Sequence, residues 1–161
     1  MKKWQLILAM VLAGCLTEAT ADQSLLSSDA ETTPRMEWLR GHGTDQGEHV
    51  FEGRQTHDDG FIAVGTTRER NGGKGDALLV KTDDQGQLQW QRIIGDKRRH
   101  EEGRCIIESP TGYYLGGIFT QGGKTGAGIV KLDKKGMIAW TRIYPHAGHG
   151  AIRGIDLAKD G

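Results

Sequence analysis

The chain has 161 residues with 25 glycines and 3 prolines, and its 21 basic residues balance its 21 acidic residues. Removal of a leader that contains Lys2 and Lys3 leaves 21 − 2 = 19 basic against 21 acidic residues, a net charge of about −2. This balance gives no electrostatic reason to expect nucleic acid or an anionic membrane surface as a partner. The length allows one domain, or one domain with a tail.

Residues 1–14 have the pattern of a signal peptide. Lys2 and Lys3 supply a positive start, and the stretch from Leu6 to Leu12 is apolar. No acidic residue occurs before Glu18. Because the apolar run is too short for a permanent membrane-spanning helix, we predict that this leader directs export and is then removed.

The leader ends in Leu12-Ala13-Gly14-Cys15, which resembles the lipobox of bacterial lipoproteins. That resemblance implies that Cys15 carries the lipid and becomes the N-terminus of the mature chain. Leu16, rather than Asp, follows this cysteine, which by the same resemblance implies the outer membrane, on its periplasmic or surface face. The alternative is an ordinary leader that is cut after Ala19-Thr20-Ala21.

Residues 15–35 are predicted to form the lipidated cysteine and a flexible tether. The stretch from Leu16 to Pro34 is rich in Ser, Thr, Asp, Glu and Ala and lacks apolar periodicity, so it cannot bury a core. If Cys15 is lipidated, Cys105 has no disulfide partner. The repeat alignment places Cys105 in one column with two glycines, Gly53 and Gly154, which predicts a small buried group.

From residue 36 onward the sequence repeats itself. The motif W-x-R occurs at Trp38, Trp90 and Trp140, at spacings of 52 and 50 residues. Each period contains four short apolar or β-branched runs separated by Gly, Asp or Asn, and in the first period these are about 50–56, 61–67, 77–82 and 88–93. Such runs predict antiparallel strands, and a fixed period of this size predicts a solenoid, a propeller or an array.

Two turns recur in each period. Asp59-Gly60-Phe61 is matched by Thr111-Gly112-Tyr113, and a second turn has Asp at its start and Gly at its end. Asp caps such a turn with its own side chain, and Gly takes the positive φ that closes it. The repeated positions that we expect to be structural are Trp38, Trp90, Trp140, Arg40, Arg92, Arg142, Gly60, Gly112, Asp83, Asp133, Gly86 and Gly136.

The combination of W-x-R, D-G-[FY] and K-x-D-x-x-G-x-x-x-W resembles the repeat of bacterial β-propeller lipoproteins, and its last part is distantly similar to the repeats of pyrroloquinoline-quinone enzymes. The resemblance implies an all-β fold with propeller-type blades of four antiparallel strands, one at about 41–92 and one at about 93–142. We also expect a strand at 36–40 and a partial blade at 143–161. About two and a half repeats leave the ring incomplete, which predicts a truncated member of this type.

No catalytic constellation is evident. His146 and His149 have the spacing of two metal ligands but lack a third, so we expect no metal. Asp58 and Asp59 are interpreted as turn residues, and we expect no cofactor. We therefore predict a non-enzymatic binding or scaffold module that is anchored to the membrane by lipid, with a protein or glycan partner and self-association through exposed sheet edges. The alternative is a propeller enzyme (a lyase, a hydrolase or a quinoprotein-like enzyme) with its site in the central channel.

Overall fold

The computed structural model describes residues 37–44, 47–68, 75–95, 99–144 and 150–159. These residues form eight β-strands and no helix, and so they include no membrane-spanning helix. Three sequence predictions lie outside the described residues: the signal peptide at 1–14, the lipidated Cys15 with its tether, and the pair His146 and His149.

The strands form two separate four-stranded sheets, each a chain-order array of antiparallel neighbours. The first sheet contains β1 (Glu48–Gln55), β2 (Phe61–Thr67), β3 (Asp76–Thr82) and β4 (Leu88–Ile94). The second sheet contains β5 (Glu102–Ser109), β6 (Gly112–Gln121), β7 (Lys124–Leu132) and β8 (Ile138–Tyr144). The prediction of an all-β fold with four antiparallel strands per repeat is confirmed.

The turns that join the third and fourth strands of each sheet have the geometry that the sequence predicts. The Asp83 carboxylate accepts hydrogen bonds from two backbone N–H groups of its turn, at 2.9 and 2.8 Å, and Gly86 has a φ of 73°. Asp133 accepts the same two bonds at 2.8 and 2.9 Å, and Gly136 has a φ of 75°. Since few residues other than glycine adopt such a φ without strain, the glycine at this position is a backbone requirement.

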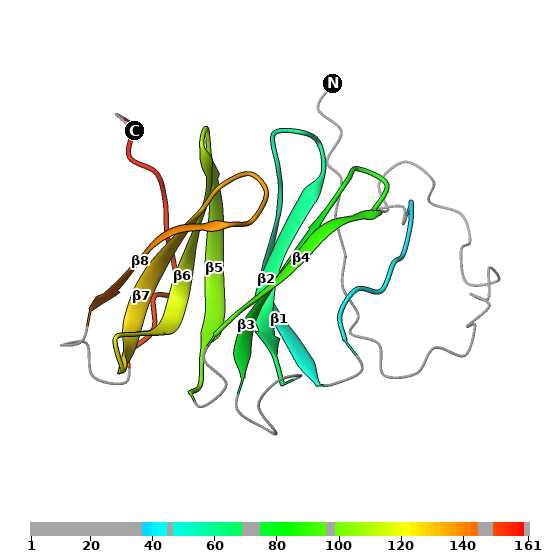
Figure 1. Ribbon diagram of the computed structural model, residues 1–161. Coiled ribbons are helices and arrows are strands. Elements are labelled where there is room, and N and C mark those ends of the chain that lie inside the picture. The colour runs from blue at the N-terminus through cyan, green and yellow to red at the C-terminus, as the bar shows by residue number, and fades with distance from the viewer. Residues whose placement is uncertain (1–36, 45–46, 69–74, 96–98, 145–149, 160–161) are drawn as a thin grey trace, which may run out of the picture.

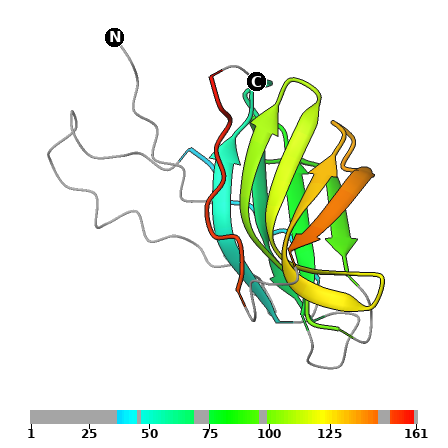
Figure 2. The ribbon, with the colours of Figure 1, turned by 90° about the vertical axis from the view of Figure 1, so that its left-hand side faces the viewer.

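The two sheets pack face to face, and their shared interface is the hydrophobic core. Figure 1 shows the second sheet beside the first, and Figure 2 shows it lying in front of the first. β5 contacts the first sheet on three of its strands, β1, β2 and β3. The buried side chains of the core are Ile62, Val64, Ala77 and Leu79 from the first sheet and Ile106, Tyr113, Leu115, Phe119, Val130 and Leu132 from the second.

The register of the strands corrects one predicted column. Cys105 is opposite Gly116, and the residue at the corresponding place in the first sheet is Glu52, opposite Val64, rather than Gly53. The shift arises because the turn between β1 and β2 is longer than the turn between β5 and β6. Cys105 is nevertheless buried and free of a disulfide, as a small interior group.

Two outer segments lie against the sheets without forming strands. Residues 37–44 (cyan in Figure 1) border the first sheet on the side away from the second sheet, so the described part of the predicted strand at 36–40 is not a strand. Residues 150–159 (red) lie beside the second sheet, where the Ile152 N–H donates to the Gly117 carbonyl at 3.2 Å. A strand needs a neighbour that continues the ladder of backbone hydrogen bonds, and within the described residues neither segment has one.

Candidate functional site

The W-x-R motif of β4 makes one of the contacts that join the two sheets. The Trp90 ring lies 5.9 Å from the Tyr113 ring, in an edge-on arrangement, and it also packs over Gly136. Arg92 stacks on the Trp90 ring at 5.6 Å and donates a hydrogen bond of 2.9 Å to the Lys135 carbonyl. A tryptophan and an arginine of one repeat are therefore bound to an aromatic ring and a turn of the next.

The same contact occurs at the other face of the first sheet. The Trp38 ring lies 5.6 Å from the Phe61 ring, and Trp38 donates to the Asp84 carbonyl at 3.1 Å. Arg40 donates to the Gln85 carbonyl at 3.2 Å. A Cβ on Gly86 would lie only 2.6 Å from the Trp38 ring, so the turn glycine makes room for the indole as well as closing the turn.

The third copy of the motif has no such partner. Trp140 on β8 is 45% exposed, and its ring neighbour is Tyr114 of its own sheet, at 6.0 Å. Arg142 is exposed as well. Within the described residues, Trp140 is therefore not covered by a second sheet, unlike Trp90.

Gly60, just before β2, and Gly112, the first residue of β6, lie at points of close backbone approach. A Cβ on Gly60 would lie 2.3 Å from the Thr82 carbonyl oxygen, and a Cβ on Gly112 would lie 2.0 Å from the Leu132 carbonyl oxygen. Gly112 also has a φ of 141°. These two repeated glycines are therefore fixed by the space between neighbouring strands.

A polar cavity of about 300 Å³ lies between the two sheets, at the end where the turns into β2, β6 and β8 meet. It is lined by His57, Asp58, Lys81, Gln89, Glu108, Tyr113 and Lys134. The lining residues come from both sheets, so the cavity exists only because the sheets are stacked.

The ionisable groups of this cavity are paired with one another. The buried Lys81 ammonium lies 2.9 Å from a carboxylate oxygen of Asp58. Glu108 accepts from Lys134 at 2.5 Å and from both the backbone N–H and the ring Nδ1 of His57 at 2.7 Å. The Glu108 contact with His57 crosses from one sheet to the other.

The pairing determines the protonation of the two carboxyls. Partial burial alone would raise the pKa of Asp58, but hydrogen bonds from Thr56 and Lys81 and the charge of Lys81 lower it to about 2. Burial would likewise raise the pKa of Glu108, but its hydrogen bonds with Lys134 and His57 and the charge of Lys134 lower it. Both carboxyls are therefore ionised near neutral pH. Burial, with the charges of Glu108 and Asp58, raises the pKa of Tyr113 to about 12, so its phenol stays protonated.

The equivalent lysine of the second sheet has a different environment. The Lys131 ammonium donates to the Ser109 hydroxyl at 2.6 Å and lies 3.9 Å from the Tyr114 ring. Pro110 occupies the position that Asp58 holds in the first sheet, and no carboxylate among the described residues pairs with Lys131. Burial, with the charge of Lys134 nearby, lowers the pKa of Lys131.

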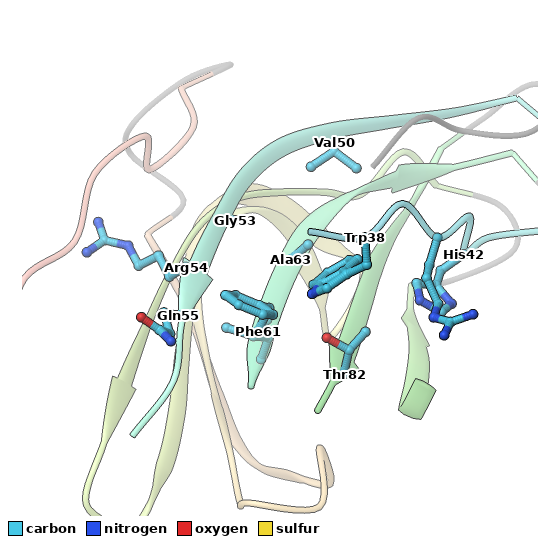
Figure 3. A pocket seen from close by; sticks show the side chains of 11 residues that line it. Trp38, His42, Val50, Gly53, Arg54, Gln55, Phe61, Ala63 and Thr82 are labelled. Carbon is cyan, nitrogen blue, oxygen red and sulfur yellow. The ribbon is translucent and has the colours of Figure 1, made fainter. Parts of the chain in front are cut away.

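A second hollow, of about 160 Å³, lies on the first sheet beside the segment that carries Trp38 (Figure 3). Phe61 and Thr82 line it below the indole, and Gly53 and Ala63 form part of its floor. Among the described residues, one extended segment, 37–44, borders this face, whereas the second sheet of four strands packs on the opposite face.

Metal binding has no support in the described part of the chain. No group of three His, Cys, Asp or Glu side chains in these ranges is arranged to hold a metal ion. The free thiol of Cys105 is also unsuited to chemistry, because burial and the nearby Glu52 charge raise its pKa. A protonated, buried thiol is a poor nucleophile.

No protein-family model and no curated protein matches the chain.

Sequence reasoning misses the polar cavity. The sequence identifies Asp58 only as a turn residue, and the turn does use it, since its carboxylate accepts from the Gly60 N–H at 3.3 Å. Its second role, as the counter-ion of Lys81, joins residues 23 positions apart. The one signal in the sequence is the lysine of the K-x-D motif, Lys81, which directly follows the four apolar residues 77–80.

Proposed function

We propose that this chain is an exported, lipid-anchored bacterial protein whose two sheets are propeller-type blades that serve as a binding or scaffold module. The partner class is a protein or a glycan, and the location is the outer membrane, on its periplasmic or surface face. No cofactor is part of the proposal.

One observation supports the blade assignment above the others. The same set of contacts, from W-x-R to an aromatic ring, a turn glycine and a turn carbonyl, occurs at Trp38 and again at Trp90. Two sheets of four antiparallel strands that stack through a repeated contact are the building pattern of a propeller. Repeat proteins in general are built from units that bury their apolar faces on one another in this way.

The polar cavity favours binding and structural support over catalysis. A catalytic acid or base needs a proton affinity matched to the working pH, whereas Asp58 and Glu108 are both held as anions by ion pairs. In the cavity, Lys81 neutralises one carboxylate and Lys134 the other. Each of these two pairs lies within one sheet, and the His57–Glu108 contact joins the two sheets, which is the arrangement expected of a structural lock.

The lipid anchor is supported by the leader alone. Lys2 and Lys3 precede a short apolar run that ends at Cys15 within Leu12-Ala13-Gly14-Cys15.

The anchor is tested by intact-mass analysis of the protein extracted from bacterial membranes. We expect an N-terminal Cys15 that carries a diacylglyceryl group, and Cys15→Ser should release the protein from the membrane or leave the precursor uncut. An unlipidated chain that begins at Asp22 would contradict the proposal. Separation of inner and outer membranes by density then tests the proposed location.

A further inference from the structure

The face of the second sheet that points away from the first sheet carries a large aromatic and cationic surface. Strand register places Tyr114, Lys131 and Trp140 in one row across this face, with Arg142 and Tyr144 beside them. Trp140 and Tyr144 are 45% and 43% exposed. In the described part of the chain, residues 150–159 lie along this outer face, near β5 and β6. Exposed aromatic surfaces of this kind mark interaction sites.

We propose that this outer face docks onto the first sheet of a second copy of the chain, at the place that Trp38 occupies in the isolated molecule. The inference rests on the proposed stacking of the repeats and extends it from one chain to two. The contact joins two different faces, so it is heterologous and propagates head to tail.

The receiving face already binds a W-x-R motif within one chain. Phe61, Gly86 and the Gln85 carbonyl hold the W-x-R segment at Trp38. Trp140 begins another copy of the W-x-R motif, and this copy lacks those three partners. The docked β8 would thus reproduce the Trp90 contacts that β4 makes with the second sheet within one chain, and residues 150–159 would have to move aside for β1 of the second copy.

The hollow on the receiving face matches the large side chain on the docking face in size. Ala63, which lines the hollow of about 160 Å³, stands where the second sheet carries the larger Leu115. On the docking face, Tyr114 stands where the first sheet carries the smaller Ile62. The larger side chain of the docking face, Tyr114, is therefore paired with the larger space, beside Ala63, as a close-packed interface requires.

The docking face and the receiving face also carry opposite charges. Across the polar cavity within one chain, Lys81 of the first sheet faces the turn residue Lys134 of the second. The docking face presents Lys131 in the place of Lys81, and the turn residue of the receiving sheet is Asp84 in the place of Lys134. Docking would bring the exposed Asp84 carboxylate of the second copy toward the ammonium of Lys131. Lys131 is only 7% exposed in its own sheet, yet its ammonium has no carboxylate partner among the described residues.

The test uses the mature protein in density-matched detergent micelles and sedimentation equilibrium over roughly two decades of protein concentration. The wild-type mass should rise with concentration. Lys131→Glu and Asp84→Lys should each weaken association by at least about tenfold, because like charges then face one another. A mixture of the two variants should associate again, since the carboxylate introduced in one variant then meets the ammonium introduced in the other.

Trp140→Ala and Trp38→Ala provide a second test that does not depend on charge. Trp140→Ala should weaken association, whereas Trp38→Ala should strengthen it, because it uncovers the receiving face. Far-UV circular dichroism should show that each variant is folded. A wild-type protein that stays monomeric, or a mixture that associates no better than its components, would overturn the docking. The stacking within one chain would still stand if Trp90→Ala destabilised that monomer, so the two proposals fail separately.

Discussion

Trp90 and Trp140 are the same residue at the same repeat position, but only Trp90 is covered by another sheet. Truncation of a fully buried tryptophan costs about 3–5 kcal/mol. Trp90 is half-buried, but Trp90→Ala also removes the Tyr113 ring contact and the stacked Arg92. We expect a loss of about 2–4 kcal/mol in the free energy of unfolding, of which aromatic pairing contributes about 0.5–1.5 kcal/mol. Trp140→Ala should cost about 1 kcal/mol or less, because the ring is 45% exposed.

The assay is urea unfolding followed by far-UV circular dichroism, which does not depend on the tryptophan signal that both variants lose. The protein concentration is kept low, so that association between chains does not stabilise the wild type. In a parallel thermal melt, a difference of about 2 kcal/mol corresponds to roughly 8 °C in the unfolding midpoint of a domain of this size. Equal losses for the two variants would refute the argument that the sheets stack through Trp90.

Three further predictions concern single positions. Gly136→Ala should lower the free energy of unfolding, measured by thermal unfolding, by at least about 1 kcal/mol more than Gly122→Ala does. Both glycines have a positive φ, but only a Cβ at Gly136 would lie 3.0 Å from an indole, so equal losses would contradict that contact. Asp58→Asn should cost about 1 kcal/mol at pH 7, after allowance for solvent screening, because it leaves Lys81 without its counter-ion. The pKa of Asp58 is about 2 in the folded state, below the unfolded value of about 3.9. The difference in unfolding free energy between wild type and Asp58→Asn should therefore persist above about pH 4 and vanish as the pH falls to about 2. A difference that does not change with pH would contradict this prediction. The Cys105 thiol should react with a disulfide reagent only after unfolding, and fast reaction in the native protein would contradict its burial and raised pKa.

The sequence predicts the strands and the turns well, because their causes are local. Alternating apolar residues, a capping Asp83 and a closing Gly86 lie within a few positions of one another, and the repeat supplies each pattern twice. The column that places Cys105 with Gly53 is wrong, because a longer turn shifts the register of a whole strand.

The cavity and the environment of the third tryptophan could not be predicted in the same way. The pairing of Asp58 with Lys81 has no counterpart in the second repeat, where Pro110 replaces the acid, so periodicity gives no sign of it. The burial of Trp140 depends on a neighbouring sheet and not on its own repeat. A motif predicts what a residue can bind, whereas its exposure is set by what lies next to it.

The central claim is that the W-x-R tryptophans at positions 38 and 90 are each bound by an aromatic ring and a turn glycine of the adjoining sheet. Nuclear Overhauser contacts of the indole protons, measured on the dilute monomer, test this most directly. The account predicts contacts from Trp90 to the Tyr113 ring and the Gly136 α-protons, and from Trp38 to the Phe61 ring. Contacts from the Trp90 indole to its own sheet alone would contradict it.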